Sequence, residues 1–136
     1  MQSFPEYKIV LSCPCALKRD SALDKEEKQK INVNSVSYFC TDANNSDKYH
    51  LSILLKKNIE YPPEKILEAI DSALISKNVQ HERKIFLNTQ AMIIDYGRAK
   101  ELELLPNDYM SYYLVVEATD SLDSKFNKWI NSIELK

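Results

Sequence analysis

The hydrophobic residues of the chain repeat with two periods, and the clearest example of each lies near its C-terminal end. Residues 109–119 are rich in aromatic and β-branched side chains and contain neither glycine nor proline, which predicts a well-covered strand. Beyond this run, apolar residues recur at the i, i+3, i+4 and i+7 positions of a helix, namely Phe126, Trp129, Ile130 and Ile133. The pattern predicts a sheet covered by a closing helix that buries Trp129.

Alternation with a period of two predicts further strands at residues 7–12, 31–41, 49–55, 83–87 and 91–99. Pro62 and Pro63 are expected to open a second helix that runs to about residue 77, because proline is tolerated in a first helical turn. Residues 101–108 are expected to form an irregular link. Since most connections between strands are short, the sequence predicts one α+β domain over residues 1–136. It should be a largely antiparallel sheet of about six strands covered by two main helices, an α/β/α sandwich.

The strand at 109–119 has two unlike sides. Its even-numbered side, with Tyr112, Leu114 and Val116, is the more apolar and should face a helix. Its odd-numbered side is richer in polar and amphipathic residues. We expect a contact surface for a partner there, formed by Tyr109, Ser111 and Tyr113 together with His50 of a neighbouring strand. If a helix covers each side instead, partner binding should move to the loops at 42–47 or 102–108.

Composition limits the partners of the chain. The 136 residues carry a formal net charge of −2, which argues against nucleic acid as the main partner, because a phosphate backbone attracts a basic face. No run approaches the roughly 20 apolar residues that a membrane span needs. No signal peptide is visible, so the protein is expected to be cytoplasmic as written, or exported if a signal peptide has been removed. The single glycine, Gly97, excludes a glycine-rich phosphate loop.

Cysteines supply the first candidate chemistry. If the first two strands pair, Cys40 approaches Cys13 or Cys15, which would give one disulfide and one remaining thiol in an oxidising compartment. Three reduced cysteines are the alternative. The Cys-Pro-Cys spacing disfavours redox catalysis, because no helix follows to lower a thiol pKa. Cys13, Cys15, Cys40 and His50 fit no zinc-binding spacing, so neither a metal nor a cofactor is expected.

Histidines supply the second candidate chemistry. The chain has only two, and His50 shares a strand face with Ser52. Residues two apart on a strand are separated by roughly 7 Å, too far for a base to accept a proton directly from a hydroxyl. No catalytic residue is therefore assigned, and the chain is not expected to be an enzyme.

Three segments resemble the PsbP-like family, which includes the eukaryotic Ran nucleotide-release factor and many small bacterial proteins. They are the opening strand that runs into Pro14, the pair at 84–94, and the closing helix at 125–135. Bacterial members often carry glycine in the middle turn, where this chain has Asn88-Thr89-Gln90. The resemblance implies a binding or assembly protein without a catalytic constellation, and it carries no family-wide site residues.

The sequence therefore favours a non-enzymatic protein-binding or assembly module, of bacterial type. An immunity or inhibitor protein that neutralises a toxin is the first alternative, since small size and acidity fit it as well. A small ligand-binding protein or enzyme is the second. A concave polar pocket holding His50 or a cysteine pair would favour this second alternative, and a flat exposed tyrosine face would favour the module.

Overall fold

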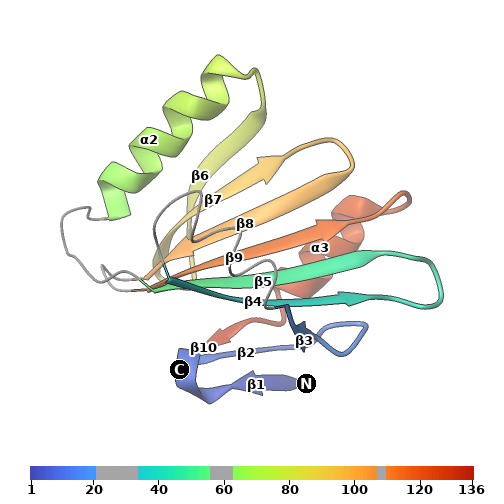
Figure 1. Ribbon diagram of the computed structural model, residues 1–136. Helices are drawn as coiled ribbons and strands as arrows, with labels where there is room; N and C mark the ends of the chain where they lie inside the picture. Colours follow the sequence, from blue (N-terminus) through green and yellow to red (C-terminus); the bar gives the residue numbers. More distant parts are fainter. Residues whose placement is uncertain (21–33, 56–62, 107–109) are drawn as a thin grey trace.

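The described residues of the chain form two antiparallel sheets and two α-helices (Figure 1). The computed structural model describes residues 1–20, 34–55, 63–106 and 110–136. The main sheet has seven strands in the order β3-β4-β5-β9-β8-β7-β6. Their bounds are Lys18–Arg19 for β3, Asn34–Thr41 for β4, Lys48–Leu55 for β5, Gln80–Phe86 for β6, Thr89–Asp95 for β7, Ala99–Leu105 for β8 and Met110–Glu117 for β9.

The predicted central strand is β9, the fourth of the seven strands. It pairs antiparallel with β5 on one side and β8 on the other. Leu114 lies opposite Leu51 and Leu102, and all three side chains are completely buried. The expected antiparallel α+β sheet is confirmed.

The helix α3, Leu122–Ile130, covers the even-numbered side of β9 as expected. Phe126 and Trp129 are buried in the same cluster as Tyr112 and Val116. Trp129 meets the ring of Tyr49 edge to face, with centroids 5.1 Å apart and planes at 83°. Such aromatic pairs stabilise a core beyond the area that they bury.

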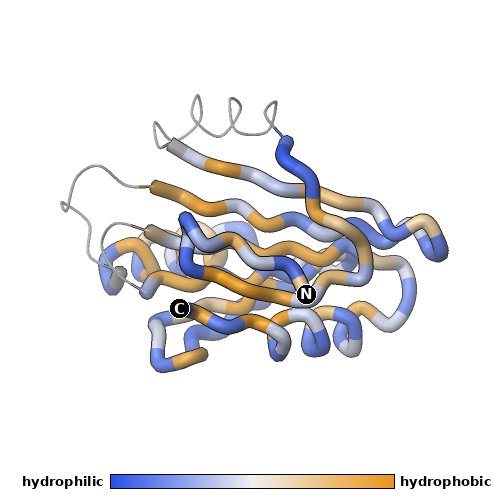
Figure 2. Tube along the Cα trace, turned by 90° about the horizontal axis from the view of Figure 1, so that it is seen from below, coloured by the Kyte–Doolittle hydropathy of each residue, from blue (hydrophilic) through white to orange (hydrophobic). Residues whose placement is uncertain are grey.

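A second, smaller sheet covers the rest of this side. It orders β1 (Gln2–Phe4), β2 (Ile9–Leu11) and β10 (Glu134–Leu135) with β2 in the middle. A short 3₁₀ helix, η1 (Pro5–Tyr7), joins β1 to β2. Ile9 and Leu11 belong to the same core cluster as Trp129, and the Tyr112 hydroxyl donates a hydrogen bond to the Tyr7 carbonyl. Both chain ends lie at this sheet, in the strands that flank β2 on its two sides (Figure 2).

The helix α2, Pro63–Ser76, covers the opposite side of the main sheet at β6 and β7. Leu67 and Leu74 pack against Met92 and Ile94 of β7 and Leu105 of β8. These residues lie on the face opposite to Leu102 and Leu104, so the sheet carries one helix on each side, as the α/β/α prediction requires. Within the described ranges, no helix has the length and apolar character that crossing a membrane would need.

The prediction of an irregular link at residues 101–108 is wrong for most of this segment, because β8 runs to Leu105. Glu103 lies between Met92 and Tyr113 in the sheet and is only 5% exposed. Burial and the neighbouring Glu101 carboxylate raise the pKa of Glu103 well above its usual range. A neutral carboxylic acid can occupy a strand position that a carboxylate could not. The predicted first strand is also shorter than 7–12 and lies in the small sheet as β2.

Replacing Trp129 with alanine should lower the free energy of unfolding by about 3–5 kcal/mol, because it empties a site that is 2% exposed at the sheet–helix contact. Circular dichroism during urea denaturation measures the loss. Trp129→Phe, which keeps an aromatic ring against Tyr49, should cost markedly less. A loss below about 1 kcal/mol for the alanine variant would contradict the role given to this helix.

The turn between β6 and β7 generates a second prediction. It consists of Leu87 and Asn88 rather than residues 88–90, and both have positive φ, 54° and 57°. A left-handed backbone costs roughly 1–2 kcal/mol for most residues but less for asparagine. Leu87→Asn should therefore raise the free energy of unfolding by about 1 kcal/mol. Leu87→Ala removes the same side chain without easing the backbone and is the matched control; equal stability of the two variants would refute the explanation.

Candidate functional site

A half-open hollow lies where α3 meets the β4–β5 turn and the end of β2. Its volume is about 770 Å³. We call it the α3 hollow, and its lining residues are Ser12, Cys13, Pro14, Asp42, Asn45, Tyr49, Lys125, Lys128, Trp129, Asn131 and Ser132.

The wall formed by the β4–β5 turn is fixed to α3 by an ion pair. The turn closes through the Asp42 amide, which donates to the Asp47 carbonyl at 2.8 Å. The Asp47 carboxylate is 2% exposed and lies 2.7 Å from the Lys125 ammonium. A buried carboxylate is costly without a charged partner, so separating Asp47 from Lys125 would be unfavourable. The ion pair therefore holds the β4–β5 turn against α3.

The wall formed by the small sheet is fixed to α3 through Ser132. Its hydroxyl accepts a hydrogen bond from the Ser12 amide at 2.9 Å and donates one to the Trp129 carbonyl at 2.6 Å. The end of β2 is thereby joined to the C-terminal end of the helix. Three segments far apart in the sequence thus meet around one hollow.

The aromatic pair Tyr49 and Trp129 contributes to the lining while belonging to the core. Burial, followed by the charge of Asp47, raises the pKa of Tyr49 to about 12, so its hydroxyl stays neutral and can donate a hydrogen bond. The indole Nε1 of Trp129 is buried and has no hydrogen-bond acceptor among the described residues.

Lysines give part of the lining a positive charge. Lys125 is engaged by Asp47, whereas Lys128 is exposed and has no ion-pair partner among the described residues. Lys125, Lys128 and Asn131 are spaced three apart, which places them along one side of the helix. The arrangement can bind apolar groups against the aromatic pair and an anionic group at Lys128.

Three cysteines meet beside the hollow. Cys15 and Cys40 form a disulfide, one of the two pairings that the sequence left open. The Cys13 sulfur remains a thiol and lies 3.7 Å from the Cys40 sulfur. Burial raises the pKa of the Cys13 thiol to about 11, which keeps it protonated at neutral pH. His50 was grouped with these cysteines in the sequence analysis. It lies on the face of β5 opposite to Tyr49, the residue that pairs with Cys40, because neighbouring residues of a strand point to opposite faces.

Three of the four residues predicted as a contact surface, Ser111, Tyr113 and His50, lie away from the hollow. Ser111 is completely buried, and Tyr113 and His50 are half-buried on the face of the sheet opposite α3. His50 packs edge to face on Phe39, and burial lowers its pKa. Tyr109 lies outside the described residues. The structure therefore groups none of Ser111, Tyr113 and His50 with the α3 hollow.

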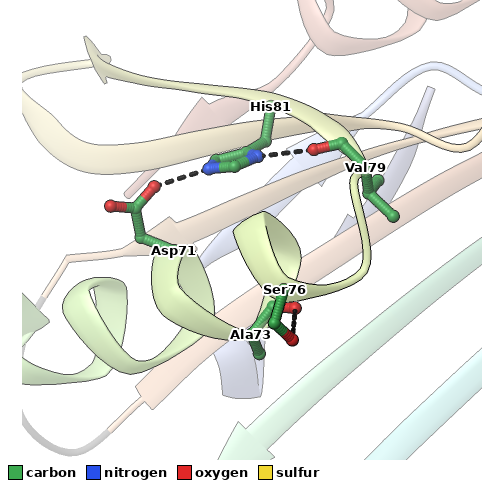
Figure 3. Close-up of polar contacts among 5 residues, drawn as sticks. All are labelled: Asp71, Ala73, Ser76, Val79 and His81. Carbon is green, nitrogen blue, oxygen red and sulfur yellow. Dashed lines mark hydrogen bonds and ion pairs between the residues drawn. The ribbon is translucent and has the colours of Figure 1, made fainter.

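The second histidine joins α2 to β6 (Figure 3). His81 Nε2 lies 2.5 Å from an Asp71 carboxylate oxygen, and its Nδ1 lies 2.7 Å from the Val79 carbonyl oxygen. The Val79 carbonyl and the Asp71 carboxylate are both acceptors, so this geometry favours the cationic imidazole, in which both ring nitrogens donate. A ring engaged at both nitrogens is unavailable as a general base.

Sequence reasoning missed the α3 hollow as a site. It named the loop at 42–47 only as a fallback place for partner binding, and it assigned no site to Lys125, Lys128 and Asn131 of the closing helix. The usable signal was the three-residue spacing of polar residues beside the aromatic stripe, but only the fold brings the turn and the Cys-Pro-Cys segment next to it.

Comparison of the chain with protein-family models, with curated proteins and with solved structures gives no match. The resemblance to the PsbP-like family thus stays a prediction, and the site has to be interpreted from its own residues.

The His81 geometry makes a pH-dependent prediction. The hydrogen bonds to Val79 and Asp71 raise the pKa of His81 above its ordinary value near 6.5. The folded state holds the proton more tightly, so the stability from this contact is complete below about pH 6.5 and is lost as the pH rises through the folded pKa. NMR titration of the imidazole should show the raised pKa. Asp71→Asn should return it toward 6.5, and a wild-type pKa at or below 6.5 would contradict the cationic assignment.

Proposed function

We propose that the protein is a non-enzymatic binding module and that the α3 hollow receives an anchoring side chain of a partner protein. The observation that carries this proposal is a hollow that combines a buried aromatic pair with Lys128, an exposed lysine that has no ion-pair partner among the described residues. Binding energy at protein interfaces concentrates in such places, where one partner side chain fills a pocket and the surrounding contacts exclude water.

The open side of the hollow favours a protein over a small molecule. Small-ligand sites usually enclose 70–90% of the ligand surface, which a half-open hollow does not do. A side chain on a protein surface needs only to enter from one direction. Lys128 further favours an anchor that has a carboxylate beside its apolar part, because opposite charges steer association.

The described titratable groups support binding over catalysis. Both nitrogens of His81 are engaged, and His50 lies on the face of the sheet opposite the hollow. The Cys13 thiol is protonated at neutral pH and is a weak nucleophile. The PsbP-like resemblance, which implies binding and assembly proteins, agrees with this proposal.

A small-molecule binding protein is the second candidate. The hollow volume of about 770 Å³ lies within the range of roughly 300–1,000 Å³ found for ligand pockets. It also has Cys13 in its lining and the Cys15–Cys40 disulfide beside it, the feature that the sequence analysis associated with a ligand site.

Affinity purification with matched variants tests the proposal. Immobilised wild type is compared with Lys128→Glu, which reverses the charge at the hollow, and with Lys84→Glu, an exposed control on β6. A protein partner should be retained by wild type and by Lys84→Glu. Its affinity for Lys128→Glu should be about tenfold weaker, the equivalent of 1.4 kcal/mol. The identity of the partner then shows whether the module assembles a complex or neutralises a toxin.

Trp129 provides the direct readout because it is the single tryptophan of the chain. Adding the purified partner should change its fluorescence emission. A partner that binds the wild type and both variants equally and leaves the emission unchanged would refute the assignment of the hollow. Emission that responds instead to the low-molecular-weight fraction of the lysate would establish the second candidate.

A further inference from the structure

The three cysteine sulfurs form a compact centre. They lie within 4.8 Å of one another, and the Cys13 and Cys40 sulfurs are 3.7 Å apart, close to van der Waals contact. Cys40 belongs to β4 and is 8% exposed, whereas Cys13 and Cys15 flank Pro14 in the segment after β2 and are half-buried. One fixed sulfur thus faces two sulfurs carried on one short segment.

We propose that this centre is a thiol–disulfide exchange site in which Cys40 is the shared sulfur. The Cys13 thiolate attacks the Cys40 sulfur, a Cys13–Cys40 bond forms, and the Cys15–Cys40 bond breaks. Cys15 leaves as a thiolate and takes up the proton that Cys13 released. One thiol and one disulfide are present before and after, so the step needs neither an oxidant nor a reductant.

Contact between the reacting sulfurs makes this step intramolecular. Holding a nucleophile against its target corresponds to an effective concentration of many moles per litre, which compensates for a small fraction of thiolate. The alternative bond between Cys13 and Cys15 would have to close across one residue, Pro14, whose ring restricts the backbone. Cys40 is therefore the sulfur common to both isomers.

The charged and titratable groups near the Cys13 thiol set its rate of attack. They are Asp42, Tyr49, Lys125 and Lys128, all of which line the hollow. Burial is the main cause of the raised pKa of Cys13, and the negative charge of Asp42 raises it further. With a pKa of about 11, the thiolate fraction rises tenfold per pH unit through the neutral range. Exchange should therefore be about 100-fold faster at pH 9 than at pH 7.

Exchange changes whether the α3 hollow has a free thiol in its lining. In the structure the free thiol is Cys13, which is part of its lining. In the other isomer the thiol is Cys15, which is not among the lining residues, and Cys13 is held in the disulfide. This inference does not depend on the proposed binding function, because the exchange needs no ligand.

Two variants test the pairing. In a glutathione redox buffer, Cys13→Ser should be fully oxidised through the Cys15–Cys40 bond and is the control. Cys15→Ser should also be fully oxidised, through a Cys13–Cys40 bond found by peptide mapping, with no thiol titratable in denaturant. Two free thiols in Cys15→Ser, under the conditions that oxidise Cys13→Ser completely, would overturn the proposal.

The wild type provides a test that needs no substitution. The protein is held at pH 7 or pH 9, its thiols are trapped with N-ethylmaleimide, and labelled peptides are quantified over time. Label should appear on Cys15 as well as Cys13, about 100-fold faster at pH 9, and not on Cys40. Label confined to Cys13 after a day at pH 9, or label on Cys40, would contradict Cys40 as the shared sulfur.

Discussion

Packing of the aromatic stripe of α3 on the even-numbered face of β9 and the odd-numbered face of β5 is the interaction on which the rest of the structure depends. Phe126 and Trp129 close the core there, and Trp129 meets Tyr49 edge to face. The same helix holds the β4–β5 turn through Lys125 and the small sheet through Ser132. Without this contact the small sheet would lose the surface against which it packs, since its strands have only two or three residues and could not stand alone.

The elements that could be predicted from the sequence are those whose pattern is long and unambiguous. The strand β9 and the helices α2 and α3 each repeat a clear period, so their existence and buried faces followed directly. The strand β8 did not, because its alternating glutamates are not typical of a covered strand, whereas the structure buries Glu103 and burial raises its pKa. The strands β1, β3 and β10 have two or three residues each and are defined by pairing rather than by pattern.

The candidate site was harder to predict than the fold, for a physical reason. Its walls come from the end of β2, the β4–β5 turn and α3, which are distant in the sequence and polar where they meet. Each polar residue has an ordinary role as a solvent-facing position when considered alone. The hollow is also built on the core itself, because Tyr49 and Trp129 belong to both. Substitutions that probe binding therefore have to be made at Lys128, at the surface, rather than at the aromatic pair.

Native-state hydrogen exchange tests the central role of the α3–β9 contact most directly. If α3 cannot separate from the sheet without unfolding the whole domain, the slowest amides of α3 and β9 exchange with the same free energy, equal to that of global unfolding. The amides of α2, which covers only the β6–β8 end of the sheet, then exchange with a lower free energy. Exchange of α3 amides at a clearly lower free energy than β9, with the sheet intact, would contradict the account.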